Sequence, residues 1–142
     1  MKRKWLLCVL AAAVFLLAAA CGEESTADLS FTNSIDTSVH NLYISDSTAD
    51  DWGDPVTFAR VDSGHTIRIN FDRIGEDAGP GNYDIGAINE DRWNFDVYDV
   101  PLAVGDQIEL SGGVDGATYT VTHADGTADT YEAEVYEDTE EE

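Results

Sequence analysis

Apolar and polar positions alternate with a period of two along most of the chain from residue 29 onward. The alternation is clearest in residues 65–71, where Ile67, Ile69 and Phe71 are expected to face inward. Gly, Asp and Pro interrupt such runs about every 8–12 residues, and no window outside residues 1–20 shows helical spacing. The pattern therefore predicts an all-β protein, a single antiparallel β-sandwich of about nine short strands behind a cleaved N-terminal signal helix.

Three hairpins are expected from the spacing of these runs. They join residues 29–34 to 39–45, residues 83–87 to 93–98, and the two halves of residues 117–136. The second hairpin would share a buried aromatic face, and Asp125-Gly126 in the third is a preferred hairpin turn. Residues 45–55 and 72–82 are predicted to be loops, because both are rich in polar and turn-forming residues.

Residues 1–20 have the composition of an export signal. Three basic residues at positions 2–4 precede an apolar run at 5–20, which is shorter than the roughly 20 residues that a membrane-spanning helix needs. The small residues directly before Cys21 resemble a bacterial lipobox, although Leu17 lies one position further from the cysteine than is usual. The alternative is an ordinary signal peptide that leaves Cys21 free.

The lipobox resemblance implies the domain organisation and the location of the protein. Residues 1–20 would be a lipoprotein signal peptide, 21–28 a lipid-anchored flexible tether, 29–136 the β-sandwich domain and 137–142 an acidic disordered tail. Cys21 would carry a diacylglycerol thioether and a fatty acyl group such as palmitate, which would attach the protein to the membrane of a bacterial cell envelope. Gly22 in place of aspartate favours the outer membrane in a diderm source.

The charge of the chain is strongly acidic. Without residues 1–20, four arginines and no lysine remain against all 29 acidic residues, which is a formal charge of −25. Such self-repulsion destabilises a compact state at low salt, so the composition is typical of proteins from halophilic, salt-rich habitats. A cationic partner or a calcium site would also explain it, whereas binding to nucleic acid is strongly disfavoured because that requires a basic surface.

Two acidic loops, residues 46–54 and 72–84, contain candidate calcium ligands. The candidate metal ligands are Asp50, Asp51, Asp54, Asp77 and Asp84. Calcium takes six to eight oxygen ligands from carboxylates and carbonyls, and loops at one end of a sandwich could share them. No EF-hand loop is present.

Catalytic arrangements are not indicated. Asp62, Ser63 and His65 are neighbours in sequence, whereas the members of a catalytic triad converge from separate elements, and no Gly-x-Ser-x-Gly elbow occurs. No two histidines lie at the spacing of a zinc site. We therefore expect a protein that is not an enzyme, with a hydrolase as a remote alternative.

Trp52 lies between aspartates in the first acidic loop. It is a candidate partner-binding residue, because tryptophan is frequent among interface hot spots. The alternative is a lid over one end of the sandwich, with the indole N–H bonded to a carboxylate.

The order of short motifs resembles a loosely defined group of small exported bacterial proteins. The motifs are Asn33, Tyr43-Ile44-Ser45, Asp51-Trp52-Gly53, Gly64 through Phe71, Tyr83-Asp84-Ile85 and Val100-Pro101-Leu102. The match covers about two thirds of the chain after the signal, and residues 117–136 look like an addition. The expected function is a non-enzymatic binding or structural module of the cell envelope with an envelope protein as partner. The alternative is a calcium-binding extracytoplasmic β-domain.

Overall fold

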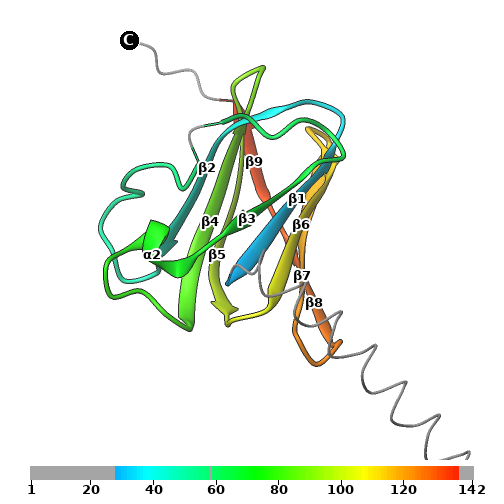
Figure 1. Ribbon diagram of the computed structural model, residues 1–142. Coiled ribbons are helices and arrows are strands. Elements are labelled where there is room, and N and C mark those ends of the chain that lie inside the picture. Colours follow the sequence, from blue (N-terminus) through cyan, green and yellow to red (C-terminus); the bar gives the residue numbers. More distant parts are fainter. Residues whose placement is uncertain (1–27, 58, 138–142) are drawn as a thin grey trace, which may run out of the picture.

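The computed structural model describes residues 28–57 and 59–137. In this part of the chain, two β-sheets pack face to face, which confirms the predicted β-sandwich (Figure 1). The elements are β1 Leu29–Ile35, β2 Val39–Asp46, β3 Thr66–Ile69, α2 Phe71–Ile74, β4 Gly81–Asn89, β5 Trp93–Leu102, β6 Asp106–Gly113, β7 Gly116–Thr122, β8 Ala128–Glu132 and β9 Glu134–Glu137. No helix within the described ranges has the length and apolar character that crossing a membrane would require.

One sheet has five strands and the other has four. The five-stranded sheet has the order β3-β1-β6-β7-β8, and the four-stranded sheet has the order β2-β4-β5-β9. All pairings within these sheets are antiparallel except that of β1 with β6, which is parallel. The inward faces meet in one core, whose largest fully buried side chains include Phe31, Phe95 and Tyr119.

The predicted hairpin between residues 29–34 and 39–45 is wrong, because β1 and β2 lie in different sheets. The connection between them is held from both layers. Asn33, on β1, donates a hydrogen bond from Nδ2 to the carbonyl oxygen of Thr37 at 2.8 Å, and Asn89, on β4, donates to Thr37 Oγ1 at 2.9 Å. The chain therefore crosses from one sheet to the other at this point.

The β4–β5 hairpin is confirmed, with Ile85 opposite Val97 and Ala87 opposite Phe95. Its turn is closed by Asn89, whose Oδ1 accepts hydrogen bonds from the backbone N–H groups of residue 91 at 3.1 Å and residue 93 at 2.8 Å. A buried asparagine that satisfies two turn donors fixes the hairpin register locally.

The predicted strand at residues 65–71 is shorter than expected. β3 ends at Ile69, and Phe71 begins the one-turn helix α2 inside the segment predicted to be a loop. Asp28 causes this break: its Oδ2 accepts a 2.7 Å hydrogen bond from Phe71 N–H, which removes that donor from the sheet. Phe71 is nevertheless buried as predicted, and its ring lies 5.9 Å from that of Tyr83.

Residues 117–136 belong to both sheets and are not an appendage. β7 and β8 form the predicted hairpin, but Val135 lies on β9, which pairs with β5 in the opposite sheet. The chain changes sheets at Ala133, whose N–H donates to the carbonyl oxygen of Ala117 at 2.9 Å. β8 and β9 thus form an edge of each layer, and Glu137 ends β9, while residues 138–142 of the predicted tail lie outside the described residues.

Candidate functional site

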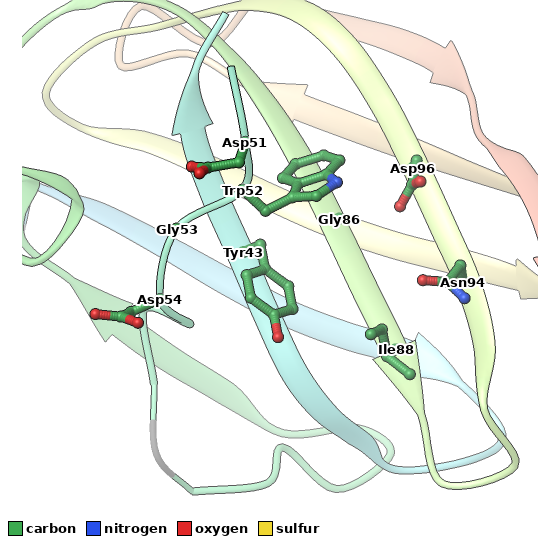
Figure 2. A pocket seen from close by; sticks show the side chains of 9 residues that line it. All are labelled: Tyr43, Asp51, Trp52, Gly53, Asp54, Gly86, Ile88, Asn94 and Asp96. Atoms are coloured by element: carbon green, nitrogen blue, oxygen red, sulfur yellow. The ribbon is translucent and has the colours of Figure 1, made fainter. Parts of the chain in front are cut away.

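A groove with a volume of about 460 Å³ lies on the outer face of the four-stranded sheet. We call it the Trp52 groove. Its lining residues are Tyr43, Asp51, Trp52, Gly53, Asp54, Gly86, Ile88, Asn94 and Asp96 (Figure 2). They come from β2, β4, β5 and the loop that follows β2, so the groove combines a rigid floor with a wall made by a loop.

The loop is fixed to the sheet on both sides of Trp52. Ser45 Oγ donates a hydrogen bond to the carbonyl oxygen of Asp51 at 3.1 Å, and Val56 N–H donates to the carbonyl oxygen of Leu42 at 2.8 Å. Val56 is buried in the core, which anchors the far end of the loop. The polar loop predicted from the sequence is therefore held across the outer face of the sheet.

Trp52 lies against the sheet because Gly86 has no side chain. A Cβ at position 86 would lie 3.2 Å from Cη2 of the indole and 2.9 Å from Asp96 Oδ1. The rings of Tyr43 and Tyr98 flank the indole, with centroids 6.2 Å and 6.1 Å from it. The predicted lid at one end of the sandwich is thus wrong in position, since Trp52 covers the outer face of the sheet, and its role in partner binding stays a prediction.

Asp96 is an acidic residue at an outward position of β5 that is nevertheless only 3% exposed. Its Oδ2 accepts hydrogen bonds from Tyr136 Oη at 2.6 Å and from Tyr98 Oη at 3.3 Å. Burial raises the pKa of Asp96 above its usual value, against the opposing effect of the two hydroxyl donors. Burial also raises the pKa of Tyr98 to about 12, with a further contribution from the charge of Asp96.

Sequence reasoning missed Asp96. Alternation around Phe95 and Val97 places it on the outer face, but nothing local indicates that it is buried. It is enclosed because β9 brings Tyr136 beside it from 40 residues further along the chain. The burial of Asp96 beside aromatic residues therefore depends on the tertiary structure.

We expect Asp96→Asn to be more stable than the wild type at neutral pH. The amide oxygen can still accept from the tyrosine hydroxyls, while the cost of burying a charge disappears. Because an acid with a raised pKa binds its proton more tightly in the folded state, the wild type gains stability as pH falls through that raised pKa toward the usual value of 3.8. The advantage of the variant should therefore shrink over the same range. Urea unfolding at several pH values, with Asp115→Asn as the control at an exposed site, measures this; equal pH profiles for the wild type and Asp96→Asn would contradict it.

The candidate calcium ligands are divided between two hollows. Asp50, Asp51 and Asp84 line one hollow beside Trp52, whereas Asp54 and Asp77 line another together with Asp51. Asp84 Oδ1 is used in structural hydrogen bonds, accepting from Ser47 Oγ and from the backbone N–H of residue 99, both at 2.9 Å. Across residues 28–57 and 59–137, no group of three or more His, Cys, Asp or Glu side chains is arranged to hold a metal ion, so the geometry gives the calcium alternative no support.

The residues considered for catalysis have structural roles. Ser63 Oγ donates to the carbonyl oxygen of Ile35 at 2.5 Å, and Asp62 Oδ1 accepts from Ser38 Oγ at 2.9 Å. Asp62 also forms an exposed ion pair with Arg60 at 2.9 Å, and His65 is exposed at the turn. These contacts fix the turn before β3.

A second missed feature is a His123 bridge between two carboxylates. Its Nδ1 lies 3.0 Å from Asp106 Oδ1 and its Nε2 lies 3.0 Å from Asp129 Oδ2. Asp106 is buried and also accepts a 2.9 Å hydrogen bond from the N–H of Ala103. Hydrogen bonds to Asp129 and Asp106 raise the pKa of His123 above its usual value of 6.5.

We expect His123 to make the stability of the fold depend on pH. Because its pKa is raised in the folded state, its stabilising effect is fully present below about pH 6.5 and is lost as pH rises through the folded pKa. His123→Gln should lack this step in thermal melts, whereas His40→Gln, at an exposed site, should keep it. A step that persists in His123→Gln would assign the pH dependence to another group.

Comparison with known protein families gives a match. A family model described as Phage Head-Tail Attachment protein matches residues 40–134, a range that begins within β2, ends at the first residue of β9 and contains every residue lining the Trp52 groove. Searches of curated proteins and of solved structures each give no match.

The match overturns one expectation from the sequence. We expected a lipid-anchored protein of the bacterial cell envelope, but the family description points to a structural protein of a phage particle. Cys21, on which that expectation rested, lies outside the described residues. The description is that of a structural protein family and names no enzymatic activity. Since the matched region covers more than half of its length, the chain belongs to the phage head-tail attachment protein family.

Proposed function

We propose that this chain is a structural component of a phage particle that joins the head to the tail through protein–protein contacts. The observation that carries the proposal is the family match over residues 40–134. The matched region includes strands of both sheets, so it takes in most of the folded domain and is more than a local motif.

The surface of the domain suits a protein interface. Trp52, Tyr43 and Tyr98 form an aromatic cluster on the outer face of the four-stranded sheet, and Tyr98 is 50% exposed. Tyrosine and tryptophan are enriched at interfaces because they offer a large apolar area at a low cost in side-chain entropy. The strands beneath them are hydrogen-bonded to one another, so a partner would meet a preformed surface.

The charge of the chain limits what that partner can be. With 29 acidic residues against seven basic ones, the chain repels nucleic acid, and packaged DNA is not a plausible ligand. A partner surface with positive charge would be attracted and oriented by the same field. The proposal is therefore one of contact with proteins of the particle.

The test is whether the chain is part of the particle and is needed to complete it. A stop codon early in its gene should give filled heads and separate tails, visible by electron microscopy, and expression of the full chain in trans should restore joined particles. Purified particles should contain the chain by mass spectrometry. Joined particles of normal yield without the chain, or a chain found in membranes and absent from particles, would refute the proposal.

A point variant connects the groove to this role. Trp52→Ala should reduce the yield of joined particles at least tenfold while leaving the fold intact, because Trp52 lies on the outer face and is not part of the core. Val114→Ala, which removes an exposed apolar side chain at the β6–β7 turn, is the matched control and should assemble normally.

A further inference from the structure

Asp96 offers an unused acceptor to the Trp52 groove. Both tyrosine hydroxyls bind its Oδ2, and within the described residues no hydrogen bond reaches its Oδ1. No fully buried side-chain oxygen or nitrogen of that region lacks a partner, so Oδ1 keeps some exposure to solvent, and Asp96 is one of the residues that line the groove. A carboxylate that is 97% buried but has one open oxygen is a strong acceptor with little competing water.

Asn94 adds a second polar group of the same kind. Its side chain is 9% exposed, lines the groove two residues from Asp96, and makes no hydrogen bond to another described protein group. Figure 2 shows its carboxamide beside Ile88 on the same side of the sheet as the indole. Leaving a nearly buried amide without a protein partner has a cost, which a ligand with a donor group would offset.

The groove combines aromatic faces with negative charge. Trp52 and Tyr43 form one wall, Asp51 and Asp54 lie exposed at the rim, and none of the lining residues is basic. An indole face attracts a cation through its quadrupole, and a carboxylate beside it adds direct charge pairing. The chemistry of the site thus favours a planar cationic group that carries several hydrogen-bond donors.

We propose that the Trp52 groove binds an arginine side chain presented by a partner protein. A guanidinium can stack on the indole of Trp52 while its planar donors reach Asp96 Oδ1 and the Asn94 carboxamide oxygen, a match that a lysine ammonium lacks. The groove volume of about 460 Å³ admits the guanidinium and the adjoining chain. The identity of the partner as a particle protein rests on the proposed function, whereas the chemistry of the groove does not.

The test is a titration of the full chain with the capped peptide Gly-Arg-Gly and with its citrulline counterpart, which keeps the shape and removes the charge. Calorimetry gives the affinity, and the NMR signal of the Trp52 indole N–H gives the position. The arginine peptide should bind at least tenfold more tightly than the citrulline peptide and should shift the Trp52 signal. Equal affinities, or binding that leaves the Trp52 signal unmoved, would overturn the inference.

Two variants separate the groove from the general acidity of the surface. Asp96→Asn should weaken arginine binding about tenfold, and Trp52→Leu should weaken it by a similar factor, while Asp115→Asn removes the same charge at a distant exposed turn and should have no effect. Equal effects of Asp96→Asn and Asp115→Asn would mean non-specific attraction and would refute the site. Trp52→Leu keeps the test valid if the fold of Asp96→Asn is altered.

The outcome is independent of the particle experiment. Arginine binding by a chain that is absent from particles would retain the groove and reject the proposed function. A chain that is present in particles but does not distinguish arginine from citrulline would retain the function and reject the groove.

Discussion

Gly112→Ala is expected to lower the free energy of unfolding by about 3 kcal/mol, a large share of the stability of a domain of this size. Gly112 has φ +97°, a conformation that L side chains rarely adopt. An added Cβ would collide with the carbonyl oxygen of Gly116 and would lie 2.9 Å from Ala117 Cα, so backbone atoms would have to move. They belong to β7, which is hydrogen-bonded on both sides within the five-stranded sheet.

Gly113→Ala is the matched control for this effect. It makes the same chemical change one residue later, where no heavy atom lies within 4 Å of the added Cβ and φ is not positive. Urea unfolding of both variants at one fixed salt concentration measures the difference. If both variants lose a similar amount of unfolding free energy, the cause is the general replacement of a glycine and not the collision with β7.

Asn33→Asp is expected to lower the free energy of unfolding by about 3 kcal/mol or more at pH 7. Asn33 is fully buried, and its Nδ2 donates to the carbonyl oxygens of Thr37 at 2.8 Å and Val61 at 2.9 Å. Its Oδ1 accepts from the N–H of Ile35 at 3.1 Å. A carboxylate would keep the acceptor but would face two carbonyl oxygens with no proton to donate.

The loss of unfolding free energy in Asn33→Asp should become smaller as pH falls. Burial and the two carbonyl oxygens would raise the pKa of the carboxyl group introduced at position 33, so the folded state would bind its proton more tightly than the unfolded chain. Once protonated, the group can again donate one hydrogen bond. Chemical unfolding between pH 4 and 8 measures this, with Asn82→Asp at an exposed position of β4 as the control; a loss that does not change with pH would contradict the explanation.

The local patterns predicted the strands and the short-range turns well. Alternation identified the β4–β5 and β7–β8 pairs, because each pair is closed by a short turn. The same signal failed at residues 33–38, where the chain changes sheets, and at Phe71, whose backbone N–H donates to the distant Asp28 where the strand ends. Both failures concern partners that lie far away in the sequence.

The candidate site was likewise predicted only in part from the sequence. The sequence singled out Trp52 and the acidic loop, and both line the groove, but it gave no indication of Asn94 or Asp96 as members of it. The acidic residues proposed as metal ligands are divided between two hollows that share Asp51, and Asp84 is used in structural hydrogen bonds. Composition alone produces many such clusters in a chain with 29 acidic residues, so their spacing in sequence carried little information.

By itself, the sequence determined the fold class, the apolar face of each central strand and the strongly acidic charge, because periodicity and net charge are properties of the chain before it folds. Tertiary structure alone decided which strands share a sheet and which polar groups become buried. Asp96 is the clearest case: a polar residue on an outer face became a buried acceptor because Gly86 left room for Trp52 and β9 brought Tyr136 alongside. Burial depends on what packs from elsewhere in the chain, and no local pattern contains that information.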